Sequence, residues 1–259
     1  MTTNPNTEVK ASPNQLNAEV VNKHLLTDEL FLLEIKPDAG VPRFTPGQYV
    51  AIGLPQEVEG KVKLLRRAYS ISSTPDKLHS LELYIALVKD GELTPQLINL
   101  NSGDRINVAP KITGHFTLDG IESGKELVLV STGTGLAPFM SMVRTAATWE
   151  VASRIHIVHG VRYQSDLGFK EELEALAAAT GRLHYYPFCS REEPQAPIRR
   201  GHVHKVFTEG LINLDPSKQH VFLCGNPAMV EETQSKLQEQ GFTEHSKKSP
   251  GNLHVEKYW

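Results

Sequence analysis

The chain has 259 residues, of which 22% are charged and 39% hydrophobic, and its formal net charge is −3. This composition indicates one large or two ordinary folded domains and excludes a disordered or fibrous chain. Its only cysteines, Cys189 and Cys224, cannot form a four-cysteine iron–sulfur or zinc site, so redox chemistry would need an organic cofactor. Because it has neither a basic excess nor an apolar run of roughly 20 residues, we expect a cytoplasmic protein that binds neither nucleic acid nor a membrane.

The first half of the sequence has the pattern of an all-β domain. Residues 1–15 are polar and predict a disordered tail. Residues 16–120 contain short segments rich in β-branched and aromatic residues, separated by proline and glycine, which predicts a barrel or a sandwich. One helix is expected over residues 93–100, with Thr94 as its N-cap and Pro95 as its first residue.

The pattern changes after the polar segment 119–125, which we take as the domain boundary. Strand and helix patterns then alternate through residues 121–259, which predicts a doubly wound parallel sheet. The strands are expected over residues 126–131, 154–161, 182–190 and 220–225 and at the end of the chain. The helices are expected within residues 132–150, 166–180, 202–212 and 226–241.

Two motifs in the first half can hold a nucleotide cofactor. In Arg67-Ala68-Tyr69-Ser70, strand alternation puts Arg67 and Tyr69 on one face and Ser70 on the other. A ring beside a guanidinium fits a flavin dinucleotide, although an ordinary edge strand with an exposed arginine has the same pattern. The segment 91–95 combines a glycine turn with a helix start, which suits an anion or is simply a capped helix.

Three motifs in the second half suggest a ligand site at the carboxyl edge of the sheet. The segment 131–138 (STGTGLAP) is a glycine-rich turn between a strand and a helix; it is neither GxGxxG nor a P-loop, and it either binds nucleotide or is a plain tight turn. The segment 224–227 (CGNP) ends a strand at the same edge, where Cys224 is either a ligand contact or a buried small residue. The terminal Tyr258-Trp259 pair either stacks on a flat ring or packs on the core.

In this order and spacing, RAYS, GELTPQL, TGTGLAP, CGNP and a terminal VEKYW resemble the ferredoxin–NADP reductase family. The chain is most similar to the bacterial flavodoxin/ferredoxin–NADP reductases that end in Glu-x-Tyr-Trp. The resemblance implies two domains, an antiparallel β-barrel that binds FAD (16–120) and a doubly wound α/β domain that binds NADP (121–259). It also implies an enzyme that passes electrons from NADPH to a ferredoxin or flavodoxin.

The same resemblance implies roles for individual residues. Ser70, Cys224 and Glu256 are expected at the reacting ends of the flavin and the nicotinamide. Arg67 is expected to hold the FAD pyrophosphate, with Tyr69 and Tyr258 on the two faces of the isoalloxazine. The other expected FAD contacts are Ala68, Ser70, Tyr84, Glu92, Leu93, Thr94, Thr132 and Trp259. The expected NADP contacts are Thr134, Gly135, Arg162, Arg191, Arg200, Cys224 and Gly225.

One position departs from the family pattern. His202 stands where the family has a further arginine for the 2′-phosphate of NADP, and Arg199 or Arg200 could replace it. Because Arg162 and Arg191 match, we expect NADP rather than NAD.

We expect a monomer whose partner is an acidic carrier. The residues Lys61, Lys63, Arg66 and Arg67 either steer that carrier or are solvated charges. The alternatives are an NADH-linked cytochrome b5-type reductase or other flavin reductase, and a flavin- or nucleotide-binding sensor without turnover. A metal site at His202 and His204 is a further alternative, although we expect no metal. A reductase with a fused iron–sulfur domain is excluded by the two cysteines.

Overall fold

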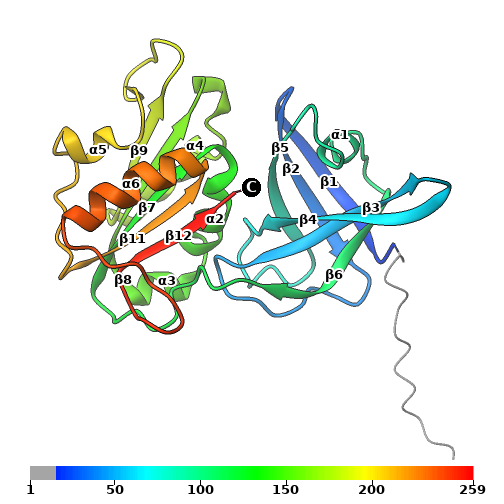
Figure 1. The fold of residues 1–259 in the computed structure, drawn as a ribbon, viewed down its shortest axis with the longest axis horizontal. Helices are drawn as coiled ribbons and strands as arrows, with labels where there is room; N and C mark the ends of the chain where they lie inside the picture. The colour runs from blue at the N-terminus through cyan, green and yellow to red at the C-terminus, as the bar shows by residue number, and fades with distance from the viewer. Residues whose placement is uncertain (1–15, 259) are drawn as a thin grey trace, which may run out of the picture.

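A computed structural model of the chain describes residues 16–258, so the predicted tail and Trp259 lie outside the described residues. These residues form two sheets of six strands each, side by side in the molecule (Figure 1). The strand order is β4-β3-β6-β1-β2-β5 in the first sheet and β10-β9-β8-β7-β11-β12 in the second.

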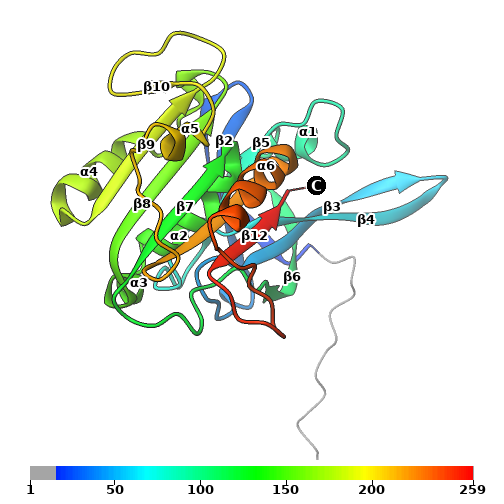
Figure 2. The same ribbon diagram turned by 60° about the vertical axis from the view of Figure 1, so that its left-hand side comes forward.

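The first sheet is antiparallel and closes into a barrel, as the sequence predicts. An antiparallel bridge between Ile71 and Leu83 joins its two outer strands, and the interior is filled by aliphatic and aromatic side chains such as Phe31 and Ile52. The elements are β1 (Ala18–Thr27), β2 (Leu30–Pro37), β3 (Tyr49–Val58), β4 (Lys61–Ser70), β5 (Leu81–Ala86), α1 (Thr94–Leu97) and β6 (Arg105–Thr113). The β3–β4 hairpin projects away from the barrel (Figure 2).

The second sheet is entirely parallel, with helices on both faces. Leu127 and Leu129 pack with α2 and α4, whereas Val128 and Val130 face the side of α5 and α6, which explains the unbroken apolar run in β7. Its strands are β7 (Lys125–Thr132), β8 (Ala152–Val161), β9 (Leu183–Cys189), β10 (Arg199–Arg200), β11 (Gln219–Gly225) and β12 (Leu253–Lys257). Its α-helices are α2 (Ala137–Val143), α3 (Ala146–Val151), α4 (Lys170–Thr180), α5 (Lys205–Thr208) and α6 (Pro227–Glu239).

Three predicted helices differ from the observed ones. The helix expected over 93–100 is the single turn α1, and the Thr94 hydroxyl does not cap it but accepts a hydrogen bond from the Val88 amide (2.9 Å). The pattern over 132–150 divides into a 3₁₀ turn, α2 and α3, because Thr145 is extended. The helix expected over 202–212 is only α5, which ends where Gly210 adopts a φ of +66°.

The last strand, β12, brings the end of the chain to the junction of the two domains. It pairs with β11 on the outer side of the second sheet, and the last described residues lie beside the barrel (Figure 1). Among residues 16–258 there is no helix with the length and apolar character needed to cross a membrane.

Candidate active site

A cavity of about 670 Å³ lies where the barrel meets the second domain. This volume is within the usual range for small-molecule and cofactor sites, roughly 300–1,000 Å³. The barrel supplies most of the wall, and the second domain adds Thr134, Glu256, Lys257 and Tyr258. The barrel residues in the wall are Tyr49, Arg67, Ala68, Tyr69, Ser70, Tyr84, Ile85, Ala86, Val88, Asp90, Gly91, Glu92, Leu93 and Thr94.

Strand register brings Ser70, Cys224 and Glu256 together. Cys224 in β11 lies directly opposite Glu256 in β12, and their side chains meet with the Sγ 3.9 Å from Glu256 Oε1. Ser70 at the end of β4 donates a hydrogen bond to the same oxygen (3.2 Å). The hydroxyl of Tyr258 bonds with the side chains of Ser70 and Cys224 and donates to the Thr134 carbonyl (3.5 Å). The cluster therefore joins residues that are 186 positions apart in the chain.

Burial determines the protonation of this cluster. It raises the pKa of Glu256, and hydrogen bonds from Ser70 and Cys224 offset part of that rise. It also raises the pKa of the Cys224 thiol, and the nearby carboxylate raises it further. Burial likewise raises the pKa of Tyr258 above its usual value. At neutral pH the cluster therefore presents a neutral thiol and a neutral phenol beside a carboxyl group that binds its proton more tightly than an exposed glutamate does.

The glycine-rich turn packs directly against the end of β11. A Cβ on Gly135 would lie 2.4 Å from the Cys224 carbonyl oxygen, and Gly225, at a φ of +129°, allows no Cβ beside Thr132. The Thr132 hydroxyl accepts a hydrogen bond from the Asn226 amide (2.9 Å) and is not in the cavity wall. The turn and β11 therefore form one closely packed edge.

His159 contacts the same glycine-rich turn from the neighbouring strand β8. It is fully buried in β8, and its Nε2 lies 3.1 Å from the Gly133 carbonyl. Burial lowers the pKa of His159 to about 4, so the ring is neutral and can donate to this carbonyl. His159 is not among the predicted site residues, although a histidine inside the apolar strand RIHIVHGV is itself a signal of a buried polar contact.

The arginines expected at the NADP phosphate lie at the carboxyl ends of β8 to β10. The Arg191 amide donates to the Arg162 carbonyl (2.9 Å), so these two positions are adjacent, and both residues are exposed. Arg200 is in β10 and forms an ion pair with Glu193 (2.6 Å). His202 precedes α5 and stacks on His204, with ring centroids 6.0 Å apart. No group of three His, Cys, Asp or Glu side chains among residues 16–258 is arranged to hold a metal ion.

The expected residues therefore fall into three groups. Arg67, Ala68, Tyr69, Ser70, Tyr84, Glu92, Leu93, Thr94, Thr134, Glu256 and Tyr258 line the cavity. Thr132, Gly135, Cys224 and Gly225 form the edge behind it, and Arg162, Arg191 and Arg200 lie on the sheet edge. Tyr49 was missed, although it faces Ser70 across the β3–β4 pair and could have been found from that pairing.

The wall fits a flat aromatic group joined to an anionic one. Tyr69 and Tyr258 contribute two aromatic rings to the wall, and burial raises the pKa of Tyr69 to about 12, so its phenol stays neutral. Arg67, which is exposed and pairs with Glu92 (2.9 Å), can turn its guanidinium to a diphosphate. The two rings and the guanidinium therefore suit a flavin dinucleotide.

The buried carboxyl of Glu256 makes stability depend on pH. Since its native pKa is raised above its unfolded value, the native state holds the proton more tightly, and stability falls as pH rises between the two pKa values. We expect Glu256→Gln to raise the melting temperature at pH 8 by roughly 2–4 °C, the effect of about 1 kcal/mol in a chain of this size, and to change it little at pH 4.

Calorimetry at the two pH values measures this difference. Glu231→Gln is the matched control, because Glu231 is exposed and, among residues 16–258, its carboxylate forms an ion pair only with Lys257. We expect this variant to leave the melting temperature unchanged at both pH values. A lower melting temperature for Glu256→Gln at pH 8 would contradict a buried, destabilising carboxylate.

Comparison with known proteins agrees with this geometry. The chain matches models of the oxidoreductase FAD-binding domain (residues 17–117) and the oxidoreductase NAD-binding domain (residues 129–235). It is 35% identical over 235 residues to the flavodoxin/ferredoxin–NADP reductase of Buchnera aphidicola subsp. Baizongia pistaciae, covering 88% of this chain and 93% of the relative. It is 36% identical over 242 residues to the ferredoxin–NADP reductase of Pseudomonas aeruginosa, covering 88% and 91%. A ferredoxin NADP+ reductase from Neisseria gonorrhoeae, solved with bound FAD and NADP, has the same fold, with a TM-score of 0.83, 24% identity and coverage of 93% and 97%. The chain therefore belongs to the flavodoxin/ferredoxin–NADP reductase family of FAD-dependent oxidoreductases.

Proposed function

We propose that this enzyme passes electrons from NADPH to an acidic ferredoxin or flavodoxin, as a monomer in the cytoplasm. The observation that carries the proposal is the cluster of Ser70, Cys224 and Glu256, which joins the wall of the barrel cavity to the nucleotide edge of the second domain. The two cysteines are free and buried, which agrees with a reducing compartment.

Bound FAD supplies the chemistry that links a two-electron hydride donor to a one-electron carrier. The chain's own residues position the reactants. Tyr69 would lie against the isoalloxazine, and Arg67 would exchange Glu92 for the pyrophosphate. Ser70 and Glu256 would hold a proton at the hydrogen bond between Ser70 Oγ and Glu256 Oε1, beside the ring. Tyr258 would exclude water from this end until the nicotinamide replaces it.

Arg162 and Arg191 would bind the 2′-phosphate, with Arg200 available once it leaves Glu193. Two arginines at adjacent backbone positions favour a phosphate over a ribose hydroxyl, because each charge-assisted contact that they can make adds to affinity. This supports NADPH rather than NADH, despite His202.

An absorbance spectrum followed by anaerobic titration tests the proposal. The purified protein should show flavin bands that NADPH bleaches at a concentration at least about tenfold lower than NADH, the factor that about 1.4 kcal/mol of phosphate binding gives. It should then reduce a ferredoxin repeatedly. Preference for NADH would favour a b5-type reductase, and bleaching without turnover on any carrier would favour a sensor.

The carrier is proposed to approach the side of the β3–β4 hairpin. Lys61 and Lys63 lie on the same face of β4 as Arg67, whereas Arg66 points to the opposite face and donates to Asn107 (2.8 Å), so the basic patch is narrower than the sequence suggests. We expect the rate of ferredoxin reduction to fall as ionic strength rises. Lys61→Glu with Lys63→Glu should slow it severalfold, and the exposed pair Lys247→Glu with Lys248→Glu, in the second domain, should not. Rates independent of salt would contradict steering.

A further inference from the structure

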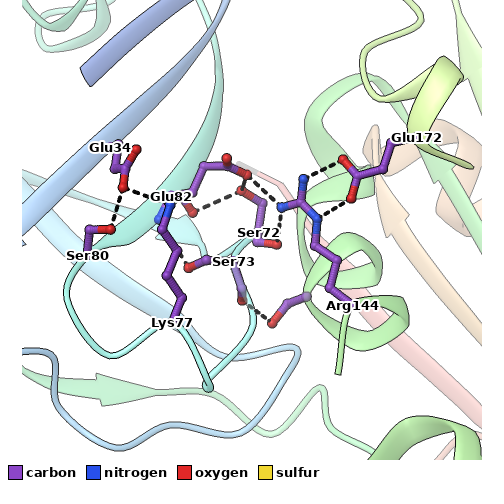
Figure 3. A network of polar contacts seen from close by, with 9 residues as sticks. Glu34, Ser72, Ser73, Lys77, Ser80, Glu82, Arg144 and Glu172 are labelled. Carbon is purple, nitrogen blue, oxygen red and sulfur yellow. Dashed lines mark hydrogen bonds and ion pairs between the residues drawn. The ribbon is translucent and has the colours of Figure 1, made fainter. Parts of the chain in front are cut away.

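Arg144 connects the two domains through a dense set of polar contacts (Figure 3). It stands at the end of α2, and its Nη1 donates to Glu82 Oε1 in β5 of the barrel (2.7 Å) and to the Ser72 carbonyl (2.9 Å). Its Nε and Nη2 donate to the two oxygens of Glu172 in α4 (both 2.6 Å). One guanidinium therefore holds a carboxylate of each domain.

Neighbouring contacts join the same two segments. The Ser141 hydroxyl donates to the Ser73 carbonyl (2.7 Å), and the Thr145 and Thr74 hydroxyls are 3.2 Å apart. The barrel segment 72–74 follows directly on the Arg67–Ser70 motif, and α2 follows directly on the glycine-rich turn. The contacts of Arg144 therefore join the segment that follows the proposed flavin strand to the helix that follows the proposed nicotinamide edge.

A second route leads from Arg144 to the cavity wall. Its Cζ lies 4.8 Å from the centre of the Phe169 ring, and that ring meets Tyr84 edge-on at 5.0 Å. Tyr84 lines the cavity, and its hydroxyl approaches the Asp166 carbonyl (3.5 Å) and leaves no room for a Cβ on Gly168. A barrel side chain is thus enclosed by the second-domain segment 166–169, which Arg144 holds in place.

We propose that Arg144 is a positioning residue that fixes the second domain against the barrel, and so sets the distance across which NADPH reduces the flavin. The inference rests on the proposed function, and it goes beyond it by assigning the domain geometry to one side chain. A misplacement of about 1 Å between reacting groups can slow a reaction 100-fold. Burial alone would lower the pKa of Arg144, but Glu172 and Glu82 outweigh it and raise the pKa, so the cation persists at all working pH values.

The two half-reactions of the holoenzyme separate positioning from general damage. Reduction by NADPH crosses the domain junction, whereas oxidation of the photoreduced enzyme by ferricyanide needs only the barrel. We expect Arg144→Leu to slow flavin reduction in stopped flow by tenfold or more, and to leave oxidation by ferricyanide within twofold. Arg144→Lys keeps the positive charge but cannot bond to both carboxylates as the planar guanidinium does, so its rate of flavin reduction should lie between those of Arg144→Leu and the unaltered enzyme.

Two further variants complete the set. Glu82→Gln removes the charge of the barrel partner and keeps the size of its side chain, so it should slow flavin reduction by NADPH less than Arg144→Leu does. It tests the same contact if Arg144→Leu does not fold. Arg182→Leu is the matched control, because Arg182 also lies over an aromatic ring, Trp149 (5.2 Å), and donates to carbonyls, but only within the second domain. It should leave both half-reactions unchanged.

Domain geometry can be measured without activity. Nitroxide labels on Leu25→Cys in β1 and Gln238→Cys in α6 report the distance between domains, since both positions are exposed and both native cysteines are buried. Arg144→Leu should broaden or shift a narrow distance distribution, and Arg182→Leu should not.

The outcomes are distinct. A selective loss of NADPH reduction with a changed distance distribution supports the inference. Equal losses in both half-reactions, or an unchanged distribution in Arg144→Leu, overturn it. If the unaltered protein does not oxidise NADPH, the proposed function fails, whereas the distance measurement still decides whether Arg144 fixes the domains.

Discussion

Replacing Gly135 with alanine should weaken NADPH binding and slow flavin reduction on the order of 100-fold, the effect of moving reacting groups by about 1 Å. The added Cβ would lie 2.4 Å from the Cys224 oxygen, 2.8 Å from the Cys224 carbonyl carbon and 2.9 Å from the Gly225 Cα. All three are backbone atoms, so no side chain can move aside to make room. The end of β11 must shift, and with it the Cys224 side chain that meets Glu256. Nucleotide titration and stopped-flow reduction measure both effects.

A control must separate this local shift from loss of stability. Gly181 ends α4 at a φ of +61° with open space around it, so Gly181→Ala strains the backbone by roughly 1–2 kcal/mol without touching the site. It should lower the melting temperature and leave NADPH reduction unchanged. A Gly135→Ala enzyme that reduces flavin at the normal rate would show that the edge formed by the turn and β11 does not position the nucleotide.

Local patterns predict the fold well where each element is decided by its own residues. The unbroken apolar run in β7 is one example. The helix expected over 226–241 is another, because α6 begins directly after Asn226, whose side chain accepts from the Ala228 and Met229 amides. The prediction is wrong where a contact outside the helix decides the conformation. Thr94 looks like a helix cap, but its hydroxyl is taken by Val88, and the helical pattern over 132–150 is broken at Thr145, whose side chain meets Thr74 of the barrel.

The candidate site, like the fold, could be predicted only where its residues are close together in the sequence. Arg67 and Tyr69 alternate along one strand, so their common position in the cavity wall follows from the motif. Ser70, which strand alternation assigns to the opposite face, lines the same wall and bonds with Glu256, so that part of the prediction is wrong. The contacts of Arg144 could not be predicted, because Glu82, Glu172 and Ser72 come from three separate elements and nothing local pairs them. Only the packing of one domain on the other brings them together.

Replacing Tyr258 with serine should make NADP+ bind roughly 10 to 100 times more tightly. The nicotinamide would no longer have to displace a buried aromatic ring, which costs about 1.5–3 kcal/mol. The Tyr258 hydroxyl bonds with Ser70 and Cys224 and approaches the Thr134 carbonyl, so the side chain lies among the residues proposed to border the nicotinamide. A nicotinamide can reach that place only when the tyrosine leaves. Deleting Tyr258 and Trp259 together should have the same effect. Discrimination against NADH should fall, because the nicotinamide end, common to both nucleotides, then contributes more of the affinity.

Tyr258→Phe separates the ring from its hydroxyl. It keeps the group that must be displaced, so we expect its affinity for NADP+ to stay close to that of the unaltered enzyme, whereas Tyr258→Ser binds more tightly. Difference spectra of the oxidised enzyme titrated with NADP+ and with NAD+ give the dissociation constants for each variant. Equal affinities in the serine variant and the unaltered enzyme would mean that the tyrosine does not compete with the nicotinamide. Tight binding in both variants would instead assign the competition to the hydroxyl and its bonds with Ser70 and Cys224.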